Sequence, residues 1–85
     1  MNITQEFRKV FEGEQATSAE EQDALLDVML FMRDDKEQGL CTDVIQAWAL
    51  KISGVIEFME ATGKISSSQE EDLRMMINRI EAGRD

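Results

Sequence analysis

The chain has 85 residues, of which 18 are acidic and 9 are basic, and its formal net charge is −9. A field of this sign repels nucleic acid and anionic membranes and favours basic protein surfaces. Direct binding of DNA or RNA is therefore the function class that the composition most strongly disfavours. An apolar content of 42% at this length is typical of one folded domain, so we expect a single domain over residues 1–85.

The single cysteine, Cys41, excludes an internal disulfide, which fits a reducing compartment. The first residues show no basic segment followed by an apolar run, and the longest apolar run, residues 28–32, is far shorter than a membrane span. We therefore expect a cytoplasmic protein without a membrane segment. The chain has no proline, and its glycines lie mainly between periodic segments, which predicts helices joined by short turns.

Residues 3–12 have the apolar spacing of a short helix, which Asn2 can cap and Gly13 can end in a left-handed conformation. Its apolar stripe includes Phe7 and Phe11. A helix of this length does not hold in isolation, so we expect it to depend on the docking of these two phenylalanines.

The second predicted helix begins at a capping box formed by Ser18 and Glu21 and ends near Gly39. Leu26 and Leu30 lie outside its main apolar stripe, so the middle of the helix is apolar nearly all round. This pattern predicts a neighbour within the chain, a homodimer seam through the two leucines, or a groove for another protein.

The third predicted helix spans residues 43–62, after a cap at Thr42, and carries two apolar faces. The broad face consists of Ile45, Trp48, Ile52, Val55, Ile56 and Met59. The narrow face, nearly opposite, consists of Ala47, Leu50, Gly54, Phe58 and Ala61. Because a helix that is apolar on two sides is normally covered on both, we expect it to be the centre of the bundle.

In that arrangement the second and fourth helices cover the broad face. The narrow face takes a close neighbour, either the helix that carries Phe7 and Phe11 or a second subunit. Gly54 supports this expectation, because glycine inside a helix costs about 1 kcal/mol relative to alanine and something should gain from its missing side chain.

Ser67 or Ser68, each followed three residues later by a glutamate, predicts the start of a fourth helix that reaches about Ala82. The predicted fold is therefore all-α, a compact bundle of four helices, one short and N-terminal and three longer, around the helix at residues 43–62.

We expect no catalytic residue, no cofactor and no metal site, and hence no enzyme. The absence of histidine removes the commonest general base and the commonest metal ligand, and a lone cysteine cannot form a structural zinc site. A twelve-residue window from Asp34 places Gly39 where a calcium-binding loop needs glycine, but Lys36 and Ile45 then occupy ligand positions.

Clusters of carboxylates are the remaining polar feature, and two of the three lie in first turns, where the helix dipole accounts for them. Asp34, Asp35 and Glu37 instead crowd the C-terminal end of the second helix, where acids are mildly destabilising. Residues that break a local rule can mark a functional surface. We therefore predict that these three residues bind a partner, together with Asp23 and Asp27 on the same helix.

These features predict a small acidic interaction module, an inhibitor or adaptor that binds a basic surface of a nucleic-acid-handling protein. Small, acidic, cofactor-free helical domains are common among phage and mobile-element proteins that inhibit host nucleic-acid machinery, including anti-restriction and anti-CRISPR proteins. Spaced carboxylates can imitate the phosphates of a nucleic acid. The analogy is one of class, size and charge, and no motif carries it.

The alternative function is a homo-oligomeric assembly protein, at its simplest a homodimer, whose seam is Leu26 and Leu30. A protein that sequesters a small molecule is a third class. The sequence supplies only scattered basic residues for an anionic ligand, namely Arg33, Lys36, Arg74 and Arg79.

Overall fold

The computed structural model describes residues 2–13 and 16–83, which contain four α-helices and no strand. The helices are α1 (Ile3–Val10), α2 (Ala19–Glu37), α3 (Thr42–Ala61) and α4 (Ser67–Glu81). The prediction of an all-α fold is confirmed. Each helix begins and ends within two residues of its predicted bounds.

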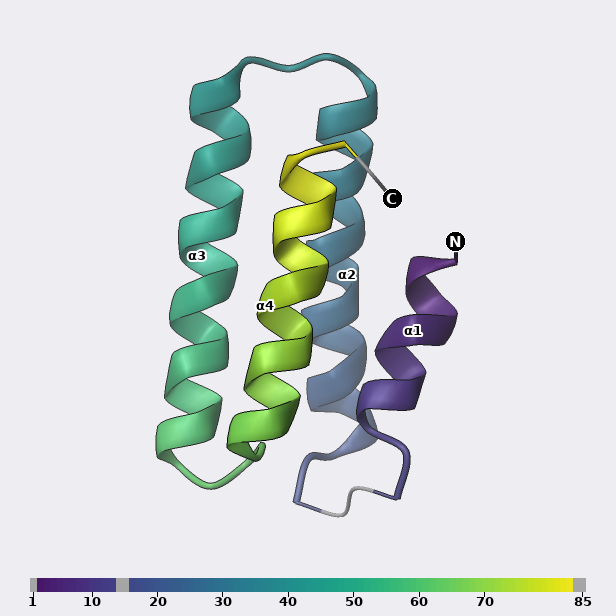
Figure 1. Ribbon diagram of the computed structural model, residues 1–85, viewed down its shortest axis with the longest axis vertical. Helices are drawn as coiled ribbons and strands as arrows, with labels where there is room; N and C mark the ends of the chain where they lie inside the picture. The colour runs from purple at the N-terminus through teal and green to yellow at the C-terminus, as the bar shows by residue number, and fades with distance from the viewer. Residues whose placement is uncertain (1, 14–15, 84–85) are drawn as a thin grey trace.

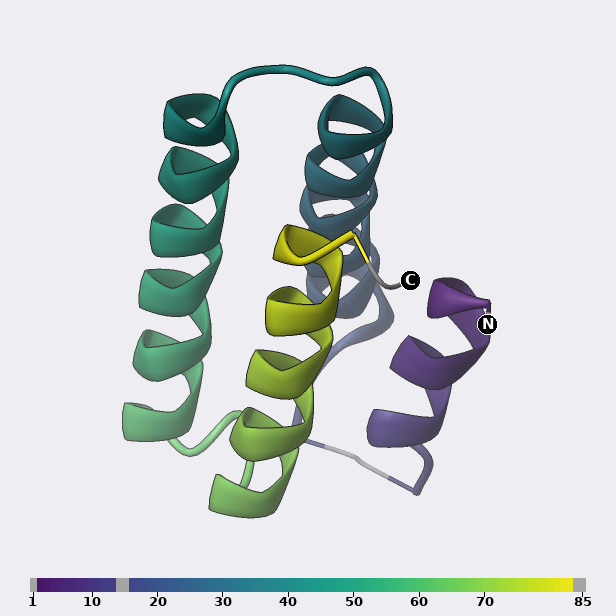
Figure 2. The ribbon, with the colours of Figure 1, turned by 45° about the horizontal axis from the view of Figure 1, so that its top comes forward.

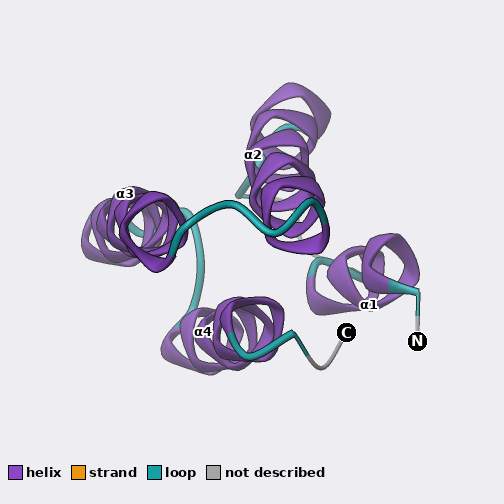
Figure 3. Cartoon of the chain, turned by 90° about the horizontal axis from the view of Figure 1, so that it is seen from above, coloured by secondary structure: helices purple, strands orange, loops and turns teal. Residues whose placement is uncertain are grey.

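Successive helices run in opposite directions, so the chain passes up and down the bundle (Figure 1). α2 and α3 lie side by side and are joined at one end of the bundle (Figure 2). α4 packs against each of the other three helices, and α1 and α3 lie on opposite sides of the α2–α4 pair (Figure 3). The prediction that the helix at residues 43–62 is the centre of the bundle is therefore wrong, because α4 is the helix that packs against all three others, whereas α3 packs against α2 and α4.

The core is a single cluster of apolar side chains from all four helices. Its largest fully buried members are Ile3, Phe7, Met29, Met32, Ile52, Ile56, Leu73 and Ile80. Leu26 is 5% exposed and Leu30 packs against the cluster. The predicted seam of Leu26 and Leu30 is therefore corrected: Leu26 belongs to the interior and Leu30 is half-buried against the same cluster, so α2 does not offer both side chains to a second copy.

Local chemistry sets the helix ends. The Asn2 side chain accepts hydrogen bonds from the backbone N–H groups of Thr4 and Gln5, and Ser18 and Glu21 form both bonds of the predicted capping box. Gly39 and Gly63 directly follow the C-caps of α2 and α3, and Gly13 lies two residues after the C-cap of α1. Their φ values of 78°, 77° and 78° are in the left-handed conformation that glycine adopts most readily.

Two predicted caps are shifted by one or two residues. Cys41, not Thr42, is the N-cap of α3, and its side chain makes no capping bond. Ser66 caps α4 in a capping box with Gln69. Gln69 has a second partner, because its side-chain amide donates to the Val10 carbonyl at 3.1 Å and so ties the start of α4 to the end of α1.

The burial of Phe7 predicts that α1 is held mainly by this side chain, which is 0% exposed and packs against Phe11 with a ring-centroid separation of 5.0 Å and an interplanar angle of 44°. We expect Phe7→Ala to lower the free energy of unfolding by about 3–5 kcal/mol in denaturant titrations followed by circular dichroism. Phe58, which is 69% exposed, is the matched control, and Phe58→Ala should cost less than about 1 kcal/mol. Equal losses in the two variants would contradict this assignment of α1.

Candidate protein-interaction site

An apolar groove of about 580 Å³ runs between α2 and α3. It is lined by Glu21, Ala24, Leu25 and Val28 from α2, by Lys51, Ile52, Val55, Phe58 and Met59 from α3, and by Thr62 and Lys64. Ligand pockets in proteins are typically concave and mostly apolar, with a few polar groups, and have volumes of about 300–1,000 Å³. The groove has this composition and size. Its lining combines residues of α2 with residues of both apolar faces of α3, namely Ile52, Val55 and Met59 from the broad face and Phe58 from the narrow face.

Phe58 stands at the edge of the groove and is 69% exposed, and Val55 beside it is exposed as well. Toward the α2–α3 turn the two helices are joined by aromatic contacts, in which Phe31 and Trp48 lie 6.3 Å apart by ring centroid. The Lys51 ammonium lies 5.8 Å from the Trp48 ring centroid. The contacts of Trp48 thus join the two helices at one end of the groove, and the ion pair of Lys64 with Glu21, at 3.4 Å, lies at the other end.

The five predicted partner-binding carboxylates do not form one surface. Asp35 accepts a hydrogen bond of 2.7 Å from the Trp48 indole N–H, so it joins α2 to α3. Asp23 forms an ion pair of 2.7 Å with Arg8 of α1. Their carboxylates therefore have structural partners within the chain.

Asp34 and Glu37 lie 3.8 and 3.9 Å from the Arg33 guanidinium, and Asp27 is exposed on the solvent side of α2. Asp27 and Asp34 are seven residues apart, which is two helical turns, so they lie on one face. Glu20 lies seven residues before Asp27 and is also exposed. We call these three residues, Glu20, Asp27 and Asp34, the acidic row.

The acidic row borders the groove, because Ala24 of the groove lies four residues after Glu20 and three before Asp27. The sequence did not identify Glu20 as a partner-binding residue, because the helix dipole already explains an acidic residue in the first turn. The seven-residue spacing of Glu20, Asp27 and Asp34 is the signal that could have identified it.

The second apolar face of α3 is uncovered. This outer face of α3 consists of Ala47, Leu50, Gly54, Phe58 and Ala61, all of them exposed. Leu50 is 77% exposed, and a Cβ atom added at Gly54 would meet nothing within 4 Å. The prediction that α1 covers this face is wrong, because α1 packs on α4 at the other side of the bundle. The second expectation, a second subunit, remains open.

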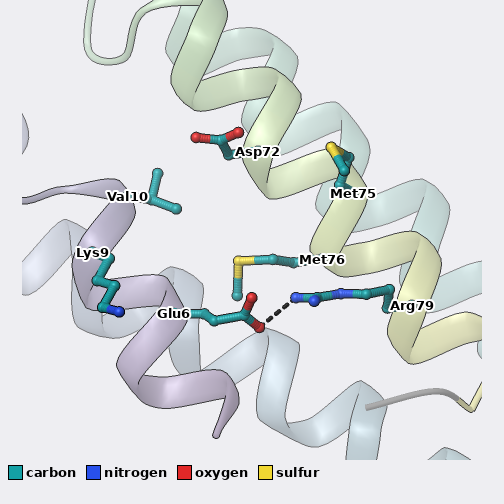
Figure 4. A pocket seen from close by; sticks show the side chains of 7 residues that line it. All are labelled: Glu6, Lys9, Val10, Asp72, Met75, Met76 and Arg79. Carbon is teal, nitrogen blue, oxygen red and sulfur yellow. Dashed lines mark hydrogen bonds and ion pairs between the residues drawn. The ribbon is translucent and has the colours of Figure 1, made fainter. Parts of the chain in front are cut away.

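A smaller pocket of about 260 Å³ lies between α1 and α4 (Figure 4). The Arg79 guanidinium binds the Glu6 carboxylate across it, and Lys9 and Asp72 add one further charge of each sign to its wall. This pocket has less than half the volume of the α2–α3 groove, and four of its seven lining residues are charged, so the α2–α3 groove is the better candidate site.

In residues 2–13 and 16–83, no group of three or more cysteine, aspartate and glutamate side chains is placed to hold a metal ion. Over the same residues, none of the helices combines the length and the apolar character needed to cross a bilayer. Comparison with known proteins finds no family model, no curated protein and no solved structure that matches this chain. Its function is therefore inferred from the chemistry of its own surfaces.

The capping box at the groove end predicts a pH-dependent stability. The hydrogen bond from the Ser18 backbone lowers the pKa of Glu21 below its ordinary value of 4.5, and the Ser18 hydroxyl and the Lys64 ammonium at 3.4 Å lower it further. A carboxylate with a lowered folded-state pKa contributes stability that is present above its unfolded pKa and is lost as the pH falls through its folded pKa. We expect Glu21→Gln to be less stable than the wild type at neutral pH, with the difference shrinking below pH 4.5. A difference that stays constant from neutral to acidic pH in denaturant titrations would contradict this role.

The open space around Gly54 predicts that the protein is more stable with alanine than with glycine at this position. Gly54 is helical and exposed, so Gly54→Ala should raise the free energy of unfolding by about 0.5–1 kcal/mol through helix propensity alone. Gly39 is the matched control, because its φ of 78° strains any other residue, and Gly39→Ala should be destabilising by about 1 kcal/mol. Loss of stability in both variants would mean that Gly54 is packed within the chain.

Proposed function

We propose that this protein is a small acidic interaction module, an inhibitor or adaptor that takes an amphipathic helix of its partner into the α2–α3 groove. The observation that carries the proposal is the groove itself, about 580 Å³ of apolar space in a chain with a net charge of −9. Contiguous apolar surface of this kind on a soluble protein is typical of a binding site.

The shape of the groove favours a helix as its occupant. Its two walls are neighbouring helices that run side by side for several turns (Figure 2), and a third helix can lie between them. In this binding mode the partner inserts apolar side chains spaced at i, i+3, i+4 and i+7. Val28 on one wall and Val55 and Phe58 on the other supply the apolar contacts.

Charge selects the partner and its orientation. The acidic row borders the α2 wall, whereas Lys51 belongs to the α3 wall. A helix with lysine or arginine along one edge is therefore attracted when that edge faces α2 and disfavoured when it is turned over. Such complementarity contributes mainly to specificity and association rate.

A basic partner is consistent with a nucleic-acid-handling protein, because such proteins carry lysine- and arginine-rich surfaces. We favour docking in the groove over imitation of a nucleic acid by carboxylates. Asp23 and Asp35 are held by Arg8 and Trp48 within the chain, so they contribute less to an electrostatic face than the sequence indicated.

Two designed peptides test the proposal. Both have about 18 residues with leucines at the i, i+3, i+4 and i+7 positions, and they differ in having lysine or glutamate at the remaining positions. We expect the lysine peptide to bind in fluorescence anisotropy and the glutamate peptide not to bind. Val55→Glu in the groove should weaken binding at least tenfold, and Met75→Glu, at an exposed position on α4, should leave it unchanged.

Two triple variants distinguish the effect of the acidic row on binding from the effect of net charge. Glu20→Gln, Asp27→Asn and Asp34→Asn together should weaken binding of the lysine peptide and reduce its salt dependence. Asp43→Asn, Glu71→Gln and Asp72→Asn change the net charge equally at exposed positions away from the groove and should have little effect. Equal affinity for both peptides, or no effect of Val55→Glu, would refute the groove as the binding site.

A further inference from the structure

We propose that the site for the basic amphipathic helix continues past the groove over Phe31, Val44 and Trp48, so that the bound helix is about four turns long and covers Trp48. We call these three residues the extension. It lies toward the α2–α3 turn, at the end of the groove where the rings of Phe31 and Trp48 meet. The inference rests on the proposed function and adds to it the length of the partner and a second set of contacts.

The extension continues the two walls of the groove on the same helix faces. On α2, Phe31 lies three residues after Val28, which lines the groove. On α3, Trp48 lies three residues before Lys51 of the groove, and Val44 lies seven residues before it. Residues three, four or seven positions apart lie on one side of a helix. The groove and the extension therefore form one face, which runs along α2 and α3 together.

Exposed apolar side chains gather on this face. The described residues expose seven large apolar side chains, of which four belong to the groove or the extension, namely Phe31, Val44, Val55 and Phe58. Their exposure means that no other helix in the described part of the chain covers this face. Contiguous apolar surface of this kind is typical of a binding site.

The acidic row is longer than the groove, and this difference is the charge evidence for the extension. The α2 residues that line the groove end at Val28, whereas the acidic row continues to Asp34, six residues or about 9 Å further. Asp34 lies three residues after Phe31 and so stands beside the extension. Its side chain is 53% exposed, with Arg33 at 3.8 Å, so it is accessible to a partner. A basic edge that pairs with the whole row therefore reaches past the groove.

The two helices give the same length for the bound partner. On α2 the acidic row runs from Glu20 to Asp34, and on α3 the exposed apolar face runs from Val44 to Phe58. At 1.5 Å per residue each segment is about 21 Å long. A helix of about 15 residues matches this length and presents apolar side chains at i, i+3, i+4, i+7, i+11 and i+14. One half of that series fits the groove, and the other half fits the extension.

Trp48 is the main contact that the extension offers. Its ring is half-buried, and its indole N–H already donates to Asp35 at 2.7 Å. A partner that covers the ring therefore buries apolar surface without leaving the indole N–H unpaired. Tryptophan is also among the residue types that carry most of the binding energy at protein interfaces. The extension should therefore add affinity to that of the groove.

Two lysine-rich peptides of about 18 residues test the extension. Both carry leucine at i, i+3, i+4 and i+7. The long-stripe peptide also has leucine at i+11 and i+14, where the short-stripe peptide has glutamine, so their charges are equal. Neither contains tryptophan, so the fluorescence of Trp48, the only tryptophan of the chain, reports on the extension.

We expect the long-stripe peptide to bind about tenfold more tightly than the short-stripe peptide. It should also shield Trp48 from quenching by acrylamide. The short-stripe peptide should bind in the groove and leave the quenching of Trp48 unchanged, because its leucines do not reach the extension.

Neutral substitutions locate the second half of the stripe. Phe31→Gln with Val44→Gln should remove the advantage of the long-stripe peptide and leave the affinity for the short-stripe peptide unchanged. The matched control is Leu50→Gln with Met75→Gln, two exposed apolar residues away from this face, and should leave both affinities unchanged. Because all four side chains are exposed and no charge changes, both double variants should unfold close to the wild-type temperature.

The extension and the groove can fail separately. Equal affinities for the two peptides, with unchanged quenching of Trp48, would overturn the extension and leave the proposed function standing. A long-stripe advantage that survives Phe31→Gln with Val44→Gln would overturn it as well, because the added leucines would then lie elsewhere. Failure of both peptides to bind would refute the proposed function and the extension with it.

Discussion

The packing of α4 against the other three helices is the interaction on which the rest of the structure depends. Its buried side chains, Leu73, Met76, Ile77 and Ile80, fill the middle of the bundle. Polar contacts hold both of its edges, with Arg79 bound to Glu6 on α1 and Arg74 placed 3.7 Å from Glu57 on α3. Because α3 and α1 pack on different sides of α4, α3 buries one side only, and α1 is held on the far side of the bundle.

That arrangement leaves two adjoining apolar surfaces uncovered, the α2–α3 groove and the outer face of α3, and Phe58 belongs to both. A domain of this length has little interior relative to its surface, so part of its apolar side chains must remain outside. In this chain Leu50, Val55 and Phe58 gather on α3 in and beside the groove, whereas Phe31, Leu40, Val44 and Met75 are exposed outside that region. The α2 border of the groove carries the acidic row.

The candidate site could be predicted only in part. Asp27 and Asp34 were identified from the sequence and belong to the acidic row, but Asp35 is used within the chain because Trp48, thirteen residues later, donates to it. A pattern on one helix cannot reveal which donors another helix brings to its side. Leu26 and Leu30 were assigned to a seam for the same reason, since apolar residues beside a main stripe look alike whether the core or a second copy covers them. The groove was missed because its two walls come from different helices.

The sequence by itself determined the four helices and most of their ends. Three local signals predict them: the spacing of apolar residues, the caps at Asn2 and Ser18, and the left-handed glycines. Each signal depends on contacts between residues only a few positions apart, so it can be recognised in the sequence. Only the tertiary structure decided which of the two apolar faces of α3 is covered. Both faces have the composition of a packed surface, and the choice between them depends on contacts between distant residues, such as Gln69 with Val10 and Arg79 with Glu6. Those contacts place α1 on α4 and leave Leu50, Gly54 and Phe58 in solvent.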